Sequence, residues 1–556
     1  MKQTTKKLLI VFASLLMIVS ATGCQKASTI TTIEKEQSTI DGPYAGKTII
    51  LHTNDIHGGY IPDENENTAE GGLEIYAIIS AIKKDFESKG ANVILIDDGD
   101  FSQGSIYVSV DKGAAVANIM DTIGYDISAL GNHEFNYGAD QLKSILEGKN
   151  YKVICSNVFK DDKCLFDSEA IFKIGDIKIG FFGLVSPETQ TKANPNFVKG
   201  LSFASKQELY DLAQKEIDLL KKESDLVICL SHLGIDASSA GNKSTDVYAN
   251  TTGIDFIIDG HSHTRMEKGD NGEPIQSTKT KGTYVGVIEI DNKTKTIENN
   301  YLLETKLVQA DNEVLDYVNN IMSKVDEDYN AIFANTEVEL DGIKEDVRSK
   351  ETNMADLITD AMVWTILKDG SIDVPNEDVV AIINGGAIRT SIGIGGITKK
   401  DINSVLPFGN TLTVNYIKGT ELLEALEAST FSCPESLGGF SQISGMEIIV
   451  DTAKEFDAGE EYPGSTYCKP NSINRVTITN INGKPFDETK TYAVISTNFM
   501  AAGGDTYYSF KRSSDAGDIF DTGITIDVVV MNYISEKLNG RITTDYQEAQ
   551  KRIIIK

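Results

Sequence analysis

Five short apolar runs, each followed at once by a polar loop, constrain the fold of this chain more than any other feature. The runs cover residues 48–51, 93–96, 127–130, 226–230 and 254–258. Apolar runs of this length are typical of strands that are covered on both faces. Segments with helical periodicity lie between them, for example residues 73–86 and 209–220. The sequence therefore predicts an α/β or α+β sandwich for the first half of the chain.

The six histidines of the chain all lie between residues 52 and 263, and five of them come shortly after one of these runs. If the strands share a sheet, the loops after them meet at one edge, where α/β proteins build their sites. Carboxylate, imidazole and amide groups together suit Mn²⁺, Zn²⁺ or Fe²⁺. The candidate metal ligands are Asp55, His57, Asp100, Asn132, His232, His261 and His263.

Seven candidate ligands are too many for one tetrahedral ion, so we expect two adjacent divalent ions bridged by a carboxylate. We interpret His52 as a structural residue because it falls next to the first run, before the polar loop begins. We interpret Asp98 and Glu134 as residues that support the ligands rather than bind the metal.

The apolar pattern changes near residue 311. Apolar side chains from Val314 to Val325 keep a helical spacing with acidic residues between them, which predicts a connecting helix. At 556 residues the chain is long enough for two or more domains. The expected segments are a first domain over residues 47–310, the connecting helix over 311–335, a second α/β domain over 336–540 and a tail over 541–556.

The second half holds no histidine, so it cannot repeat the metal chemistry. Its glycine-rich turns let a ligand approach the backbone, and its arginines offer forked donors to phosphate or carboxylate. Phenylalanines on turns are suited to stacking on a nucleobase. From the residues alone, the alternative stays open that these are ordinary turn, core and surface residues. The candidates are Arg348, Asn384, Arg389, Phe408, Phe499 and Asp505.

The charge of the chain limits its partners. With 52 Lys and Arg against 82 Asp and Glu, the formal net charge is −30. Such a field repels phosphates, so general binding to nucleic acid or to an anionic membrane surface is not expected. A phosphate-bearing ligand needs local positive charge, from metal ions or a few arginines.

Ordered sequence blocks in both halves closely resemble those of the 5′-nucleotidases of the calcineurin-like metallophosphatase superfamily, which include bacterial UDP-sugar hydrolases and cyclic-nucleotide phosphodiesterases. The blocks of the first half are His-Thr-Asn-Asp-Ile-His-Gly at 52–58, Asp-Asp-Gly-Asp at 97–100, Gly-Asn-His-Glu-Phe at 131–135 and Gly-His-Ser-His at 260–263. The resemblance covers residues 47–540. It implies a metallophosphatase β-sandwich flanked by helices, followed by a C-terminal α/β nucleotide-specificity domain.

The resemblance also implies a role for each candidate ligand. One ion would be held by Asp55, His57, Asp100 and His263, and the other by Asp100, Asn132, His232 and His261. Asp100 would bridge the two ions. His133 would not be a ligand, but would face the phosphoryl group and stabilise its charge or protonate the leaving oxygen.

For the substrate, the resemblance implies that Phe408 and Phe499 stack on the two faces of the base and that Asp505 binds the ribose hydroxyls. The other residues that it implies are Arg348, Asn384 and Arg389 on the phosphate side and Gly445 in the base pocket. The implied activity is removal of phosphate from extracellular nucleotides, chiefly 5′-mononucleotides. The alternatives are 2′,3′-cyclic-nucleotide 2′-phosphodiesterase with 3′-nucleotidase activity, UDP-sugar hydrolysis, or nucleotide binding at the surface without turnover.

One position departs from the 5′-nucleotidase pattern. The residue three after the catalytic histidine is usually Asp in those enzymes, whereas this chain has Asn136. A neutral amide supports a protonated imidazole less than a carboxylate does. The cyclic-nucleotide relatives resemble the Asn version, and a strained cyclic diester needs less help in expelling its leaving group. We therefore predict that Asn136 acts with His133 in catalysis and that the protein has appreciable 2′,3′-cyclic phosphodiesterase activity alongside its 5′-nucleotidase activity.

The N-terminus is predicted to be a targeting segment. Three lysines precede an apolar stretch over residues 8–18 that is too short to span a bilayer. Small residues and then Cys24 follow, which resembles a bacterial lipoprotein box. The resemblance predicts a signal peptide over residues 1–23, a lipid on Cys24 that anchors the protein to the outer face of the bacterial cell membrane, and a flexible tether over 24–46.

Five further cysteines leave the disulfide pattern open. An odd number of cysteines outside the cell means at least one unpaired or mixed thiol. By spacing, the possible pairs are Cys155 with Cys164 and Cys433 with Cys468, whereas Cys229 lies in an apolar run that favours a buried thiol.

Overall fold

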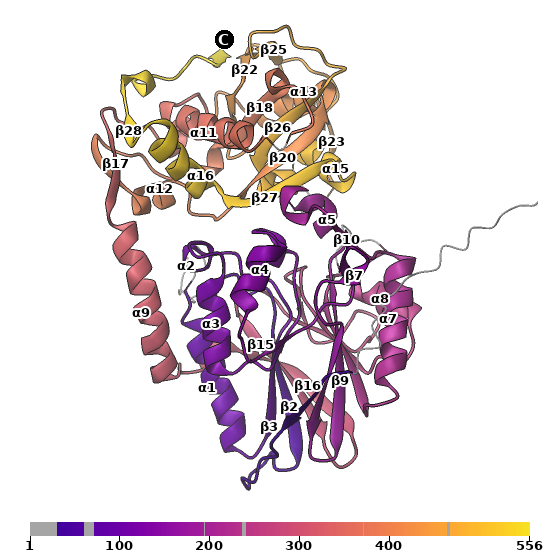
Figure 1. The fold of residues 1–556 in the computed structure, drawn as a ribbon. Helices are drawn as coiled ribbons and strands as arrows, with labels where there is room; N and C mark the ends of the chain where they lie inside the picture. The colour runs from indigo at the N-terminus through magenta and orange to yellow at the C-terminus, as the bar shows by residue number, and fades with distance from the viewer. Residues whose placement is uncertain are drawn as a thin grey trace, which may run out of the picture.

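Figure 1 shows two domains stacked end to end and joined along one side by a long helix. The computed structural model describes residues 30–59, 72–193, 195–235, 239, 241–370, 372–463 and 467–556. The predicted signal peptide and the predicted lipid site at Cys24 lie outside the described residues. Within these ranges, no helix combines the length and the apolarity that a membrane crossing requires.

The first domain is a sandwich of two sheets. Their strand orders are β16-β15-β2-β3-β4-β5 and β1-β8-β9-β11-β12-β14-β13. Strands β2 to β5 run parallel to one another, as do β9, β11, β12 and β14. The strands of this domain are β1 (Thr32–Lys35), β2 (Lys47–Thr53), β3 (Asn92–Asp97), β4 (Ile127–Ser128), β5 (Lys152–Val153), β6 (Val158–Lys160), β7 (Lys163–Cys164), β8 (Glu169–Ile174), β9 (Ile177–Val185), β10 (Leu201–Phe203), β11 (Leu226–His232), β12 (Phe256–Asp259), β13 (Arg265–Met266), β14 (Ile275–Thr278), β15 (Tyr284–Asp291) and β16 (Thr296–Glu304).

Helices cover the outer faces of both sheets. Apolar residues of α1, α3 and the connecting helix pack on the outer face of the sheet that contains β2, and those of α7 and α8 pack on the sheet that contains β11. The helices of this domain are α1 (Ile75–Ser88), α2 (Ile106–Ser109), α3 (Ala114–Ile123), α4 (Ala139–Leu146), α5 (Thr189–Lys192), α6 (Pro195–Val198), α7 (Gln207–Leu220) and α8 (Ser244–Asn250), with a 3₁₀ turn η1 (His133–Phe135) and another, η3 (Thr305–Leu307).

Both faces of the central strands are buried, which explains their uninterrupted apolar runs. Ile50 and Ile94 from one sheet meet Phe181 and Ile228 from the other in a single buried cluster between the sheets. Leu51, the next side chain along β2, points to the opposite face of the sheet and packs beneath α1 and α3. The predicted helix-flanked sandwich is therefore confirmed.

The strands before the histidine loops do not share one sheet, contrary to the assumption made from the sequence. β2, β3 and β4 belong to one sheet, and β11 and β12 belong to the other. Their loops nevertheless meet, because the carboxyl ends of both sets of parallel strands open onto the same space. His232 at the end of β11 lies beside Asp55, which follows β2.

Part of the predicted flexible tether is an edge strand. β1 pairs parallel with β8, and its Ile33 packs against the cluster between the sheets. Lys35 Nζ lies 2.6 Å from Asp126 Oδ1 in the neighbouring part of the domain. Three of the four residues of this short strand are polar, which suits an edge position.

The second domain is built on a mixed sheet with the strand order β21-β18-β26-β20-β27. Residues of α11, α12 and α16 cover one face of this sheet, and residues of α13 and α15 cover the other. Its strands are β17 (Ile332–Thr336), β18 (Val379–Asn384), β19 (Gly395–Thr398), β20 (Thr411–Lys418), β21 (Ser441–Ser444), β22 (Met446–Val450), β23 (Ala458–Glu461), β24 (Cys468–Pro470), β25 (Val476–Ile481), β26 (Thr491–Thr497), β27 (Ile519–Thr525), β28 (Arg541–Ile542) and β29 (Ile553–Ile555). Its helices are α10 (Lys344–Val347), α11 (Asn353–Asp369), α12 (Lys399–Val405), α13 (Gly419–Ser429), α14 (Asn498–Ala501), α15 (Tyr508–Asp515) and α16 (Ile526–Asn532), with short turns η4 (Asn376–Asp378), η5 (Gly385–Ala387), η6 (Tyr533–Lys537) and η7 (Thr544–Tyr546).

The last residues are part of this domain rather than a free tail. β28 pairs with β17, and β29 pairs with β22. Between these strands, Arg552 Nη2 donates to both carboxylate oxygens of Asp360 on α11, at 2.7 and 2.9 Å. A bidentate pair of this kind fixes the orientation of the chain end on the domain.

The connecting helix α9 (Asn312–Tyr329) is shorter than predicted, because the residues after it form β17. Its apolar face packs on α1 and α3 of the first domain. Tyr107 in α2 donates to Asp326 at 2.9 Å, whereas Lys399 of the second domain pairs with Asp328. The C-terminal turn of α9 is thus tied to both domains.

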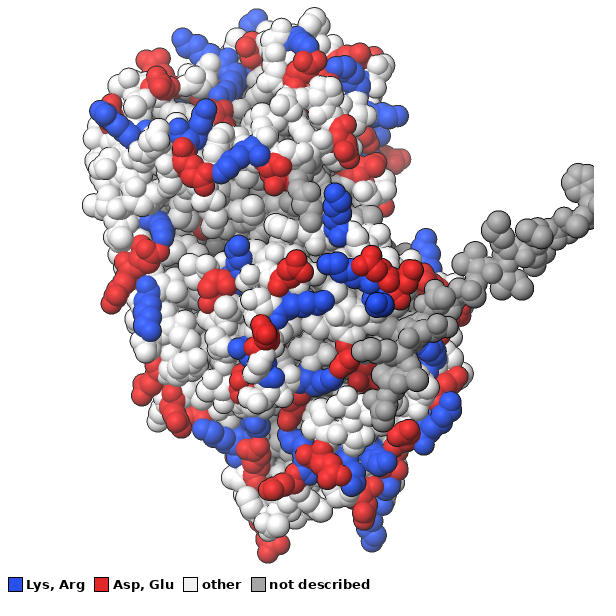
Figure 2. All heavy atoms as spheres, viewed as in Figure 1, with Lys and Arg blue, Asp and Glu red and all other residues white. Residues whose placement is uncertain are grey.

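Acidic and basic side chains are interspersed over the face of the molecule that Figure 2 shows. Charged residues of the chain form ion pairs, such as Lys47 with Glu298 at 3.0 Å and Lys221 with Asp255 at 2.6 Å. Surface pairs of this kind contribute little each to stability. The excess acid of the chain therefore does not gather into one patch on this face.

Neither of the possible disulfides forms within the part of the chain that the structure describes. Cys155, Cys433 and Cys468 are free thiols. Cys229 is also free and fully buried in the apolar run that was predicted to hold it.

A buried carboxyl pair makes the stability of the first domain depend on pH. Glu216 on α7 is 1% exposed and lies against Glu169 on β8. Burial and repulsion from Glu169 raise the pKa of Glu216 to about 7 from an ordinary value of 4.5. The folded state thus favours the protonated acid, so this contribution to stability is complete below pH 4.5 and is lost as the pH rises through 7.

We expect Glu216→Gln to flatten the pH dependence of unfolding. The amide cannot ionise, so the loss of stability between about pH 5 and pH 8 should be smaller than in the wild type. Urea midpoints across this range measure the effect, and Glu208→Gln, an exposed acid on the same helix, is the matched control. Identical pH profiles for the wild type and Glu216→Gln would contradict the assignment.

Candidate active site

The loops after five strands bring the candidate ligands into one space between the carboxyl ends of the two sheets. Asp55 and His57 follow β2, Asp100 follows β3, Asn132 and His133 follow β4, His232 ends β11, and His261 and His263 follow β12. Five of these residues have a left-handed backbone with φ between 49° and 73°, namely Asp55, His57, Asp100, His261 and His263. Residues with a Cβ adopt this conformation at a cost, and such strain gathers at functional sites.

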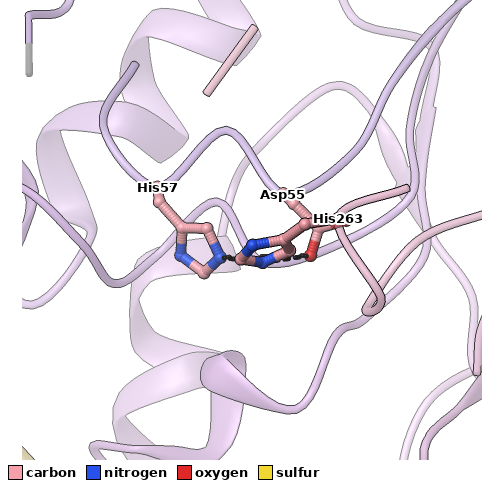
Figure 3. Close-up of side chains that lie close together, drawn as sticks. All are labelled: Asp55, His57 and His263. Carbon is pink, nitrogen blue, oxygen red and sulfur yellow. Dashed lines mark hydrogen bonds and ion pairs between the residues drawn. The ribbon is translucent and has the colours of Figure 1, made fainter. Parts of the chain in front are cut away.

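Asp55, His57 and His263 form the first group of possible ligands (Figure 3). His263 Nε2 lies 3.4 Å from Asp55 Oδ1 and 3.3 Å from His57 Nε2. His57 Nδ1 is 2.9 Å from the carbonyl oxygen of Gln103, which leaves Nε2 turned toward the group. The ligand atoms of the three residues lie within 4.8 Å of one another, close enough to hold one metal ion.

Asp55, Asp100 and His232 form a second group that shares Asp55 with the first. His232 Nε2 lies 3.1 Å from Asp100 Oδ2 and 3.7 Å from Asp55 Oδ1. Its Nδ1 is 2.6 Å from the carbonyl oxygen of Asp98. His232 Nε2 is buried and makes no hydrogen bond within the described residues. A ring that is oriented through one nitrogen and presents the other, unbonded, to two carboxylates fits a metal ligand.

The electrostatics of this space require positive charge. Burial alone would raise the pKa of Asp100, but His232, His133 and His57 hold this pKa well below its usual range. Burial opposes the charged form of His232 too, yet Asp100 and Asp55 raise its pKa well above the ordinary value. Buried carboxylates are stable only beside cations. Imidazole protons supply that charge, and divalent ions among the same ligands would supply it instead.

Asn132 and His261 lie beside the group that contains His232. Asn132 Oδ1 lies 2.7 Å from His261 Nδ1, and the rings of His232 and His261 are 5.5 Å apart. The structure thus brings together all seven ligands predicted from the sequence.

His133 stands at the edge of these groups. Its backbone N–H donates to Asp100 Oδ1 at 2.9 Å, and its Nδ1 lies 2.6 Å from Asn136 Oδ1. Its ring is 5.2 Å from that of His57. With His57 and Asp100 it forms a further group whose ligand atoms are close enough for a metal. The contact with Asn136 engages Nδ1 and leaves Nε2 as the ring nitrogen available to a ligand.

The residues that we interpreted as supports occupy supporting positions. The Glu134 carboxylate accepts the N–H groups of Asp100, Phe101, Ser102 and Gly131 at 2.6 to 3.0 Å, so it shapes the loop that carries Asp100. Asp98 contacts His232 through its backbone carbonyl. His52 is fully buried against Gln276 at 2.8 Å, and burial lowers its pKa to about 4, so it is a neutral core residue.

In the second domain, Asn384 and Asp505 meet at the end of β18. Asn384 Nδ2 donates to Asp505 Oδ2 at 2.9 Å, and Asp505 has a left-handed backbone with a φ of 51°. Burial raises the pKa of Asp505, whereas Asn384 and the nearby Arg348 oppose this shift. A Cβ on Gly439 would lie 3.1 Å from the Cβ of Asp505, so the glycine loop passes close to this carboxylate.

Phe408 and Phe499 project from the same end of the central sheet. β20 and β26 are antiparallel neighbours, so the segment before β20 lies beside the segment after β26. Phe408 is 57% exposed and Phe499 is 41% exposed, which is unusual for large aromatic side chains and leaves part of each ring accessible to a ligand. The Arg389 guanidinium lies 5.4 Å from the Phe408 ring centroid.

Gly445 does not lie beside Asn384 and Asp505, contrary to the expectation from the sequence. β21 pairs antiparallel with β18, so Ser441 lies opposite Asn384 and Ser444 opposite Ala381. Gly445 therefore lies at the far end of β18 from Asn384. Its φ of +78° and the close approach of the Val379 carbonyl explain the glycine as a turn residue between β21 and β22.

Sequence reasoning missed the contact between the two domains at this site. A Cβ on Gly523 in β27 would lie 2.7 Å from the Cβ of Asn136. Asp521, also in β27, lies close enough to His133 for the two charges to interact; burial raises the pKa of Asp521, and His133 is among the groups that oppose this. The short Asp-Thr-Gly sequence at 521–523 predicts a turn, but it does not indicate that this turn contacts Asn136 of the first domain.

Comparison with known proteins relates both domains to one family. A family model described as calcineurin-like phosphoesterase matches residues 48–265, and one described as the C-terminal domain of 5′-nucleotidase matches residues 332–512. Human 5′-nucleotidase is 28% identical over 550 residues, which cover 90% of this chain and 92% of the human protein. A snake venom 5′-nucleotidase from Gloydius brevicauda is 27% identical and covers 89% of this chain and 88% of its own length.

Solved structures agree with these matches. The 5′-nucleotidase precursor of Thermus thermophilus is 28% identical, with a TM-score of 0.52 over 92% of this chain and 99% of that one. The NAD nucleotidase of Haemophilus influenzae, 20% identical with a TM-score of 0.63 over 92% of this chain and 100% of its own, shares the fold. The two family models fall, in order, on the two domains of the structure, so the chain carries a calcineurin-like phosphoesterase domain followed by a 5′-nucleotidase C-terminal domain and is a phosphoester hydrolase.

Proposed function

We propose that this protein removes phosphate from extracellular nucleotides, chiefly 5′-mononucleotides, with the help of two divalent metal ions. The observation that carries the proposal is the convergence of carboxylates and imidazoles around buried Asp55 and Asp100, with His232 Nε2 unbonded among them. Such an N and O ligand set suits Zn²⁺, Mn²⁺ or Fe²⁺. The second domain carries exposed phenylalanines, the Asp505 carboxylate and arginines, which suit the base, the ribose and the phosphate of a nucleotide. These residues support the choice of a nucleotide as the substrate.

The proposed ligands divide into two sets that share Asp100. One set is Asp55, His57, Asp100 and His263, and the other is Asp100, Asn132, His232 and His261. When bound, such ions neutralise phosphoryl charge and make water a better nucleophile at neutral pH. The chain itself positions the substrate and handles the proton of the leaving group.

His133 is the proposed catalytic residue beside the ligands. Its Nδ1 is held by Asn136 at 2.6 Å, so its Nε2 is the atom that is free to face the phosphoryl group. From there it would stabilise developing charge or deliver a proton to the leaving oxygen.

The second domain is proposed to hold the nucleoside. The exposed rings of Phe408 and Phe499 are suited to the two faces of the base, and the Asp505 carboxylate is suited to the ribose hydroxyls. The arginines are proposed to contact the phosphate side, where their forked donors suit its oxygens.

A substrate panel tests the proposal. Hydrolysis of AMP, 3′-AMP, 2′,3′-cyclic AMP and UDP-glucose is measured by chromatography of the products, each with and without a chelator. We expect AMP to give the highest kcat/KM and the chelator to abolish its turnover. Binding of AMP without turnover of any of the four would favour the alternative of a surface nucleotide-binding protein.

The neutral Asn136 beside His133 was an added argument for the cyclic-nucleotide alternative that the resemblance implies. Asp521 of the second domain places a carboxyl group close enough to His133 to interact with it. This weakens the argument from the neutral Asn136. A higher kcat/KM for 2′,3′-cyclic AMP than for AMP in the panel would restore it, and preference for UDP-glucose would identify a UDP-sugar hydrolase.

We also propose that a lipid on Cys24 anchors the mature protein to the outer face of the bacterial cell membrane. The sequence around Cys24 supports this proposal. Mass spectrometry of the N-terminal peptide tests it, and Cys24→Ala should release the protein from the membrane fraction. A wild-type peptide that carries an unmodified Cys24 would rule the anchor out.

Asp100→Ala should abolish metal binding and turnover together. Loss of a partner that only orients a ligand costs about 10- to 100-fold, so loss of the shared ligand itself should cost more than about a hundredfold in kcat. Metal analysis and AMP hydrolysis measure both effects, and Asp161→Asn, an exposed hairpin residue, is the control. Near wild-type activity in a folded Asp100→Ala protein would refute the shared-ligand assignment.

Phe408→Ala and Phe499→Ala should weaken the use of nucleotides but not of p-nitrophenyl phosphate, which has no base. Stacking is worth about 1–3 kcal/mol per base, so KM for AMP should rise about 5- to 150-fold. Phe408→Tyr and Phe499→Tyr keep the ring and should keep KM near the wild-type value. Equal losses on both substrates would mean that the two rings are merely structural.

A further inference from the structure

Strand β27 carries a bulge where it pairs with β20. Thr411 pairs with Thr525 and Thr413 pairs with Asp521, so two steps along β20 correspond to four steps along β27. A bulge disrupts the hydrogen bonds of a sheet and redirects its backbone, and bulges are frequent beside active sites. This bulge lies at the end of the second domain that faces the first domain (Figure 1).

Side chains give the bulge a fixed shape. Asp521 Oδ1 accepts the N–H of Gly523 at 2.9 Å, and Asp521 Oδ2 accepts the hydroxyl of Thr411 at 2.6 Å. The Thr522 hydroxyl donates to the carbonyl of Leu412 at 2.9 Å. Gly523 has a φ of +69°, which a residue with a Cβ rarely adopts.

The bulge rests on the catalytic loop of the first domain. A Cβ at Gly523 would lie 2.7 Å from the Cβ and 2.8 Å from the Nδ2 of Asn136, so these two residues are already in close contact. Asn136 is only 4% exposed, and its Oδ1 is the group that orients the ring of His133. Beside this contact, Asp521 forms a parallel backbone bridge with Ala193 at the end of α5.

The other side of the bulge is connected to the loops that carry the two aromatic rings. The N–H of Thr411 donates to Asn498 Oδ1 at 3.2 Å, and the same oxygen accepts the N–H of Phe499 at 2.9 Å. Phe408 lies three residues before Thr411. One series of hydrogen bonds therefore runs from the proposed base site to Asp521 and the bulge.

We propose that residues 521–523 are a positioning element: by packing against Asn136, they hold His133 in the orientation that turnover requires. The proposal rests on the proposed function. It means that the catalytic loop of the first domain is complete only when the second domain is packed against it.

A double-mutant cycle tests the contact. Gly523→Ala places a methyl group inside the space that Asn136 occupies, and misplacement of a catalytic group by about 1 Å costs up to about a hundredfold. We expect kcat for AMP to fall about ten- to a hundredfold, with KM changed less than about threefold, because the aromatic rings and Asp505 are untouched. In an Asn136→Gly background, which removes the Cβ as well as the amide, the methyl group has room, so the same substitution should lower kcat less than about twofold further.

The backbone strain of alanine at Gly523 is present in both backgrounds, so it cannot imitate this result. An equal loss in both backgrounds, or no loss in either, would overturn the proposal. Thr411→Val removes the hydroxyl that holds Asp521 and should lower kcat in the same way, whereas Thr411→Ser should restore it. A Thr411→Ser protein as impaired as Thr411→Val would also contradict the proposal.

Hydrogen exchange separates this proposal from the proposed function, because it needs no turnover. Amides of residues 133–138 should exchange faster in Gly523→Ala than in the wild type, and unchanged exchange would count against the contact. If the wild type itself fails to hydrolyse AMP, the proposed function fails, while the exchange result still decides whether the bulge orders the catalytic loop.

Discussion

Asp55 and Asp100 are buried carboxylates whose negative charge must be balanced, and the rest of the active site is arranged around this requirement. They are 0% and 1% exposed, and a carboxylate at such a position is stable only beside positive charge and hydrogen-bond donors. The imidazoles of His57, His232 and His263 surround them, and the left-handed backbone at four of these five positions, all but His232, turns the side chains inward. The shape of the loops, the location of the histidines and the suitability for divalent cations all follow from this buried charge.

The two-sheet sandwich allows this concentration of charge. Parallel strands in each sheet present their carboxyl ends to one space, so ligands far apart in the sequence meet without long loops. The strands can be apolar throughout because both of their faces are covered. The polar residues of the site thus follow the ends of strands, and the second domain contacts this region at Asn136.

The second domain adds what the first domain lacks. It has no histidine, but it offers exposed aromatic rings, a carboxylate and arginines at the end of its central sheet. The connecting helix α9 is tied to both domains, and β27 contacts the loop that holds His133. The proposed substrate site and the proposed catalytic residue are therefore joined by packing as well as by the chain.

Much of this arrangement could be predicted from the sequence, for local physical reasons. The apolar runs indicated β2, β3, β11 and β12, and the polar residues after them indicated the ligands, because each signal lies within a few residues of its element. The sequence could not assign these strands to two sheets, nor foresee that Asn136 would contact Gly523, since both depend on pairing between distant segments. Gly445 was misassigned because a glycine in a turn looks the same whether or not a ligand lies nearby.

Anomalous diffraction from crystals of the mature chain grown with Mn²⁺ tests the central claim most directly. The account predicts two peaks about 4 Å or less apart, with Asp100 contacting both and His232, His261, His57 and His263 distributed between them. A single peak, or ions bound away from Asp55 and Asp100, would contradict it.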